Sequence, residues 1–319
     1  MGKNNTKISA SVYLCSDVVA FNMSKILFKK LSTAFPQINF EYCQNSDDFK
    51  ESLKNADIVI TWIFKEEWYD LAPHLKGIFT PAAGYDWIAS APDNKIKIFH
   101  GTFHGLIIRE ALLGMILYNL RKQEKADKNQ QLKKWDRNYG SPSRILRGQK
   151  VLILGCGNIG LCCAKLFLFL GCSVVGVVRK KKKNRFQADG LSIITLNEMN
   201  SCLPTVDHLI TLLPKTPGTD NIIKKKHFQL LKKTAFFYNL GRGNCIDENV
   251  LVEALDNKEL AGASLDVFGQ EPLPISSPLW EHPQMKITPH SSCIIEEYMA
   301  LYIEELIEKI KDLIQATLF

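Results

Sequence analysis

Several hallmarks of common protein classes are missing from this 319-residue sequence. Its longest near-continuous apolar stretch, residues 166–178, is shorter than the about 17–25 residues that a membrane helix needs, so we expect no membrane partner. The first residues lack the apolar core of a secretory signal, which favours a cytoplasmic protein. The nine cysteines show no zinc-site spacing, and we expect reduced thiols and no bound metal.

The sequence is also short of acidic charge: Lys and Arg number 40, Asp and Glu 33, and the net charge is +7. Such an excess is typical of proteins that bind polyanions or an anionic ligand. Six basic residues and no acid lie in the single stretch 179–185, and the rest of the chain has a net charge of +1. This stretch has no interleaved aromatic residues, so we expect an anionic small molecule and no nucleic acid.

Strand and helix patterns alternate along the chain, which predicts an α/β fold with two doubly wound parallel-sheet domains. In the first hundred residues, strands are predicted at 8–14, 38–43, 57–63, 77–80 and 95–99, and helices at 23–31 and 46–53, the latter starting at Ser46. Further on, strands are predicted at 151–154, 173–178, 208–212, 235–239 and 262–266, with helices at 107–120 and 247–255. An apolar stripe at 299–314 predicts a last helix, with Glu305 and Lys309 paired on its other face.

A glycine-rich turn follows the strand predicted at 151–154. Gly155, Gly157 and Gly160 form G-x-G-x-x-G between a buried strand and a helix, the context in which this motif binds a dinucleotide. Gly155 permits the tight turn, Gly157 lets a pyrophosphate approach the backbone, and Gly160 lets the helix pack closely. The helix N-terminus favours the anion.

The end of the next strand indicates which dinucleotide binds. An NAD site usually has an acidic residue there that binds the ribose 2′-hydroxyl, but the sequence has Val178 followed by Arg179 and Lys180. Valine cannot accept that hydrogen bond, whereas an arginine can make a forked contact to a 2′-phosphate. The sequence therefore predicts that NADPH is preferred and that NADH remains possible.

Three charged or titratable residues follow three strands of the second predicted sheet. Arg242 lies in Asn-Leu-Gly-Arg-Gly, Glu271 lies after Ser-Leu-Asp-Val-Phe, and His290 lies in Thr-Pro-His-Ser-Ser. Ligands of open α/β sheets bind at the carboxyl ends of strands, so the three side chains could converge on one site.

Together with the glycine loop, these motifs resemble the D-isomer-specific 2-hydroxyacid dehydrogenases. Gly241-Arg242-Gly243 with Asp247, Asp266 to Glu271-Pro272, and Pro289-His290 carry the resemblance, and Ser277-Pro-Leu-Trp280 resembles the glyoxylate/hydroxypyruvate reductase branch. The resemblance implies a flavodoxin-like substrate domain (1–105 and 294–319), a Rossmann cofactor domain (106–293), an active site in the cleft between them, and a homodimer formed through the 121–143 arm around Trp135.

The resemblance also implies the site residues. The catalytic set would be Arg242, Glu271 and His290, and the substrate would bind Ala83, Gly84 and Tyr85 as well as Arg242 and His290. The cofactor would bind Gly155, Gly157, Asn158, Ile159, Gly160, Arg179, Lys180, Pro214, Thr219, Leu240, Asp266 and Ser292.

These residue types suit the reduction of a small 2-keto acid, such as glyoxylate or hydroxypyruvate, to a D-2-hydroxy acid. Arg242 can bind the carboxylate and polarise the keto oxygen, and His290 can donate the proton. A free imidazole is only about a quarter protonated at pH 7, and a neighbouring carboxylate such as Glu271 favours the cation. Two alternatives stay open: another dehydrogenase of the family, such as 3-phosphoglycerate dehydrogenase, and a nucleotide-sensing, corepressor-like interaction protein.

Overall fold

The computed structural model describes residues 7–92, 95–181 and 188–315, and the chain forms two compact units. The first unit comprises Met1–His104 and Ile294–Phe319, and the second comprises Gly105–Cys293. Gly105 groups with the second unit and not, as predicted, with the first. The reason is close packing, because a Cβ on Gly105 would lie 2.7 Å from Cβ of Cys162.

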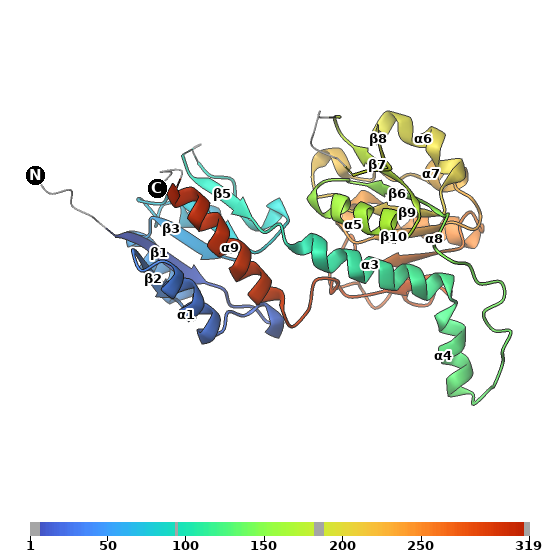
Figure 1. Cartoon of the computed structure of the whole chain (residues 1–319), viewed down its shortest axis with the longest axis horizontal. Helices are drawn as coiled ribbons and strands as arrows, with labels where there is room; N and C mark the ends of the chain where they lie inside the picture. The colour runs from blue at the N-terminus through green and yellow to red at the C-terminus, as the bar shows by residue number, and fades with distance from the viewer. Residues whose placement is uncertain (1–6, 93–94, 182–187, 316–319) are drawn as a thin grey trace, which may run out of the picture. The chain divides into compact units, whose positions relative to one another are not determined.

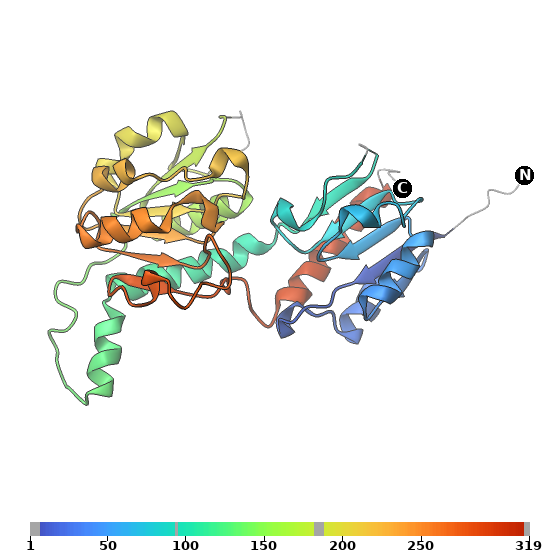
Figure 2. The same cartoon turned by 180° about the vertical axis from the view of Figure 1, so that it is seen from behind.

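The first unit is a five-stranded parallel sheet with helices on both faces (Figures 1 and 2). Its strands are β1 (Ile8–Tyr13), β2 (Ile38–Tyr42), β3 (Ile58–Thr61), β4 (Gly77–Thr80) and β5 (Lys97–His100), and its helices are α1 (Lys25–Ala34), α2 (Ser46–Ser52) and α9 (Tyr298–Gln315). The strand order β2-β1-β3-β4-β5 is the flavodoxin-like order. On one face, α2 packs Phe49 against Val59 and Ile78, while α1 and α9 lie side by side on the other.

The second unit is a seven-stranded parallel sheet in the order β12-β11-β10-β9-β6-β7-β8. Its strands are β6 (Lys150–Leu154), β7 (Ser173–Val178), β8 (Leu191–Thr195), β9 (His208–Thr211), β10 (Phe236–Asn239), β11 (Gly262–Leu265) and β12 (Met285–Ile287). Its helices are α3 (His104–Leu120), α4 (Gln123–Gln131), α5 (Asn158–Phe169), α6 (Met199–Cys202), α7 (Lys225–Leu230) and α8 (Glu248–Asp256). This order is that of a Rossmann sheet extended by one strand, so the predicted fold class is confirmed for both units.

The central strand β6 shows why its sequence is a continuous apolar run. Val151 and Ile153 face a core shared with Phe167 of α5, and Leu152 and Leu154 face a core shared with Leu251 of α8. Because helices cover both faces of the parallel sheet, every position of the strand after Lys150 is buried. Because β6 is packed on both faces, the position of the glycine loop at its end is fixed.

Three local predictions differ from the structure. The side chain of Asn45, not Ser46, accepts the first N–H groups of α2, because Ser46 is already helical. Strand β8 was not predicted, and the polar arm 121–143 contains helix α4. Within the described ranges, no helix is long and apolar enough to cross a membrane.

Candidate active site

The three glycines of the turn after β6 differ in how much space a side chain would have there. Gly155 has a φ of +98°, and a Cβ there would lie 2.7 Å from the carbonyl oxygen of Leu212. A Cβ on Gly160 would lie 2.5 Å from the carbonyl oxygen of Gly155. A Cβ on Gly157, in contrast, would meet nothing within 4 Å. The fold therefore requires Gly155 and Gly160, whereas the space beside Gly157 is open to a bound group.

The N-terminus of α5 fits the phosphates of a dinucleotide. The helix is 12 residues long, and its N-cap, Gly157, provides no side chain to accept the N–H groups of the first turn, which include those of Asn158, Ile159 and Gly160. Free amides at a helix N-terminus attract anions. Cys156 inside the turn is buried, and burial raises the pKa of its thiol to about 11, which agrees with a packing role.

The end of β7 has the predicted charge pattern. Val178 is buried, whereas Arg179 and Lys180 are exposed. Lys181 forms an ion pair with Glu198 at 3.1 Å, so it is partly neutralised. The rest of the basic stretch, Lys182 to Arg185, lies outside the described residues.

The loops that follow β9 and β10 lie against each other at the same sheet edge. Thr219 donates a hydrogen bond to the carbonyl oxygen of Pro214 at 2.8 Å, which closes the first loop, and Leu240 is buried at the start of the second. A Cβ on Gly241 would lie 2.6 Å from the amide nitrogen of Leu213. The structure thus brings these predicted cofactor residues to the edge that carries the glycine turn.

The backbone of Arg242 is fixed from both sides. Asn239 at the end of β10 is fully buried; its side chain donates to the Arg242 carbonyl at 3.1 Å and accepts from the Gly241 amide at 3.1 Å. On the other side, a Cβ on Gly243 would lie 1.9 Å from the carbonyl carbon of Phe268. The guanidinium itself is half-buried and donates to the Gly241 carbonyl at 2.9 Å.

Glu271 and His290 form a direct pair. Nδ1 of His290 lies 2.8 Å from Oε2 of Glu271, while Oε1 accepts the Phe268 amide at 2.9 Å. With Nδ1 bound to the carboxylate, Nε2 of the ring is left to exchange a proton with a substrate. His290 has a left-handed backbone (φ 51°), and its amide donates to the Asp266 carbonyl at 2.8 Å.

Asp266 holds the loop that carries His290. Its side chain is nearly buried, and it accepts hydrogen bonds from Thr288 Oγ1 at 2.5 Å and from the amides of Ser291 at 3.0 Å and Ser292 at 3.1 Å. The predicted contact of Asp266 with the cofactor stays a prediction. Ser292 Oγ is buried and has no hydrogen-bond partner among the described residues, so it is available to a ligand.

Two supports of this site, Asn239 and Thr288, have no predicted role. Both are polar residues at or just beyond the end of a buried strand, and that position is the signal that could have identified them.

The predicted substrate loop lies in the first unit, after β4. Ala83 and Gly84 are half-buried, and Tyr85 is 69% exposed. The ring of Tyr85 packs edge-on against His100, with 4.5 Å between the ring centroids. His104, in contrast, is buried and lies 2.9 Å from the hydroxyl of Tyr298, so it has a packing role.

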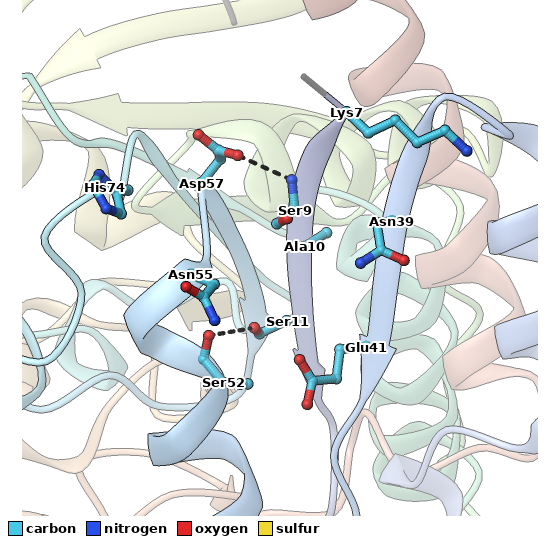
Figure 3. Close-up of a pocket in the computed structure, with 10 residues that line it drawn as sticks. All are labelled: Lys7, Ser9, Ala10, Ser11, Asn39, Glu41, Ser52, Asn55, Asp57 and His74. Carbon is cyan, nitrogen blue, oxygen red and sulfur yellow. Dashed lines mark hydrogen bonds between the residues drawn. The ribbon is translucent and has the colours of Figure 1, made fainter. Parts of the chain in front are cut away.

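Two cavities lie elsewhere. One, of about 530 Å³, is open over the polar face of β1 and β2, where Ser9, Ser11, Asn39 and Glu41 point the same way (Figure 3). The other, of about 540 Å³, lies in the arm beside Trp135. Neither contains a predicted catalytic, substrate or cofactor residue. In the part of the chain that the structure describes, no group of three or more His, Cys, Asp or Glu side chains could hold a metal ion.

Comparison with known proteins identifies the family. The model of the D-isomer specific 2-hydroxyacid dehydrogenase NAD binding domain matches residues 113–292. A glyoxylate/hydroxypyruvate reductase A of Serratia proteamaculans is 30% identical over 279 residues, which cover 83% of this chain and 84% of the relative.

Two solved structures agree. A D-isomer specific 2-hydroxyacid dehydrogenase family protein from Aeromonas salmonicida has a TM-score of 0.80 at 26% identity, covering 98% of this chain and 97% of that one. An NADPH-dependent glyoxylate/hydroxypyruvate reductase from Sinorhizobium meliloti, solved with NADP and sulfate, has a TM-score of 0.78 at 25% identity, covering 96% of both chains.

The chain therefore belongs to the D-isomer specific 2-hydroxyacid dehydrogenase family, whose members are NAD(P)-dependent enzymes that interconvert 2-hydroxy and 2-keto acids. The predicted family and class of enzyme are confirmed.

Proposed function

We propose that this enzyme reduces glyoxylate, hydroxypyruvate or a similarly small 2-keto acid to the D-2-hydroxy acid, with NADPH preferred over NADH. The observation that carries the proposal is the His290–Glu271 pair at 2.8 Å. Glu271 follows β11, which lies next to β10 in the sheet, and Arg242 follows β10. The reductase relatives support this reading over a 3-phosphoglycerate dehydrogenase or a corepressor-like protein.

In this proposal each residue has one role. The guanidinium of Arg242 binds the substrate carboxylate and polarises the keto oxygen, and the amides near Ala83 and Gly84 hold the same carboxylate. Nε2 of His290 donates its proton to the keto oxygen, and Glu271 stabilises the imidazolium and orients the ring. When bound, the dihydronicotinamide supplies the hydride that the keto carbon receives.

The proposed cofactor site uses residues whose geometry fits a dinucleotide. The open space beside Gly157 and the uncapped amides of α5 would take the pyrophosphate, and Arg179 with Lys180 would take the 2′-phosphate. Ser292, with its unpartnered hydroxyl, and Asp266 would lie near the nicotinamide end.

We also propose a cytoplasmic homodimer that forms through the 121–143 arm. The arm carries Trp135, which is 92% exposed, beside the second cavity. A large exposed apolar side chain of this kind is typical of an interaction surface.

One experiment tests the activity directly. Purified protein is assayed with a panel of 2-keto acids, each with NADPH and with NADH, and turnover of glyoxylate or hydroxypyruvate with a higher kcat/KM for NADPH is expected. His290→Ala should lose roughly 10²–10⁴-fold in rate, whereas His74→Ala, a change at an exposed histidine of the first unit, should keep the wild-type rate. Near-full turnover by His290→Ala at saturating substrate would exclude the proposed role of that residue.

A further inference from the structure

A charged pair on the C-terminal helix fixes the segment that follows β5. Nζ of Lys309 donates to Oε1 of Glu305 at 2.5 Å and to the carbonyl oxygen of His100 at 2.6 Å. Glu305 in turn accepts the amide of Thr102 at 2.9 Å and its hydroxyl at 2.7 Å. One ion pair thus binds the backbone on both sides of Gly101.

This ion pair is more than a surface contact. The side chain of Lys309 is 27% exposed and that of Glu305 only 17%, so solvent screens the pair less than an exposed one. Burial by itself raises the pKa of Glu305, but the hydrogen bonds and charge of Lys309 and Thr102 outweigh it, and the pKa is lowered overall. The carboxylate therefore stays ionised and keeps both contacts at neutral pH.

The anchored segment contacts the proposed substrate loop at two points and the residue just before the loop, Pro81, at a third. The amide of Gly101 donates to the Ala82 carbonyl at 3.2 Å, and a Cβ on Gly101 would lie 2.2 Å from the carbonyl oxygen of Pro81. The other contact with the loop is the ring of His100 against the ring of Tyr85, at 4.5 Å. Thr80 at the end of β4 pairs with His100 at the end of β5, so the segments that follow these two strands leave the sheet at the same level.

The ring of His100 can support the ring of Tyr85 as an uncharged, packed side chain. Burial lowers its pKa, the Ala82 backbone raises it, and the nearby charge of Lys309 lowers it further, with a net lowering. The lowered pKa favours the uncharged ring, which acts on Tyr85 by contact. The ring of Tyr85 is itself mostly exposed, and the aromatic ring that packs against it in the described structure is that of His100.

We propose that Glu305 and Lys309 are positioning residues for the substrate loop, acting through the segment 100–102 and, at its end, through His100 on Tyr85. The proposal rests on the proposed function, because it assumes that the loop 82–85 binds the 2-keto acid. It adds that the C-terminal helix sets how tightly that acid binds, without touching it.

The decisive variant is Lys309→Met, which keeps the aliphatic stem but loses both charge-assisted hydrogen bonds. We expect KM for the 2-keto acid to rise roughly tenfold, with kcat within about twofold and KM for NADPH unchanged. Lys309→Arg should restore most of the loss. Lys311→Met is the matched control, because Lys311 forms an exposed pair with Glu308 at 2.8 Å on the same helix.

Two further measurements separate positioning from general loss of structure. Combined with Tyr85→Ala, the change at Lys309 should raise KM by less than the product of the two single effects. Hydrogen exchange of the amides at 82–85, measured without substrate, should be faster in Lys309→Met than in wild type and unchanged in Lys311→Met.

The proposal is overturned if Lys309→Met leaves KM for the acid unchanged, raises KM for NADPH equally, or combines multiplicatively with Tyr85→Ala. Unchanged hydrogen exchange at 82–85 would overturn it independently of any activity. If wild-type protein reduces no 2-keto acid but exchange at 82–85 responds as expected, the proposed function fails while the anchoring of the loop stands.

Discussion

The contact between Glu271 and His290 yields the sharpest prediction for the chemistry. In Glu271→Gln, the amide oxygen can still accept the Phe268 N–H, which the carboxylate accepts at 2.9 Å. The amide NH₂ group then faces Nδ1 of His290, where the carboxylate oxygen lies at 2.8 Å. Because NH₂ only donates, Nδ1 must become an acceptor, and the imidazole is held neutral. The variant should keep the loop but lose the stabilised cation.

The size of the effect follows from the exposure of the pair. A hydrogen bond to a charged group contributes about 1.5–3 kcal/mol, which corresponds to roughly 10- to 150-fold in rate. The side chains of His290 and Glu271 are 43% and 36% exposed, so solvent screens part of this energy. We therefore expect the lower part of the range, a loss of roughly 10- to 30-fold in the rate of the chemical step.

The assay is single-turnover oxidation of NADPH by saturating glyoxylate or hydroxypyruvate, so that product release does not hide the chemical step. Glu248→Gln is the matched control, because Glu248 accepts the amide of Gly269 at 2.8 Å in the same loop without a hydrogen bond to His290 in the described structure. It should keep more than about half of the wild-type rate, within the usual effect of a surface change. The reasoning is refuted if Glu271→Gln stays within about twofold of wild type, or if both variants lose the same factor.

Three other predictions test the cofactor preference, the pH dependence and the arm. Arg179→Ala should raise KM for NADPH roughly 10- to 100-fold and leave KM for NADH unchanged; an equal loss with both would contradict a contact to the 2′-phosphate. His208 is buried and burial lowers its pKa to about 4, so the unfolded chain takes up its proton first, below about pH 6.5. The contribution of His208 to the free energy of unfolding should therefore fall by roughly 3 kcal/mol between pH 6.5 and 4, which urea titrations measure as the difference in pH dependence between wild type and His208→Gln. Trp135→Glu should give monomers in sedimentation velocity, whereas Ile275→Glu, at a 98% exposed apolar residue outside the arm, should not.

Local patterns were enough to predict most of the second unit. A glycine turn between a buried strand and a helix has few structural alternatives, and the structure shows Gly155 and Gly160 in the tight contacts the motif requires. Strand ends are also local features. Because β11 and β12 are neighbours in a parallel sheet, Glu271 and His290 could be expected to meet, and they do. Arg242 follows the next strand of the same sheet, β10.

Predictions failed where two signals competed or where the pattern was weak. Asn45 and Ser46 are both good N-cap residues, and only the backbone shows that Asn45 has the extended conformation of a cap. Strand β8 lies at the edge of its sheet and is only half-buried, so its alternation is less regular than that of the central strands. The supports Asn239 and Thr288 have roles that depend on partners in other loops.

The partners of Glu305 and Lys309 outside their own helix could not be predicted from local sequence patterns. The sequence predicts Glu305 and Lys309 as an i, i+4 pair on the face opposite the apolar stripe, and such pairs normally face solvent. Both side chains instead lie mostly buried against residues about 200 positions earlier in the chain, because the C-terminal helix completes the first unit. No local spacing encodes that return of the chain. The same return makes the loop after β4 depend on the last helix, so substitutions at Glu305 or Lys309 should alter substrate affinity before they alter the chemistry of Arg242, Glu271 and His290.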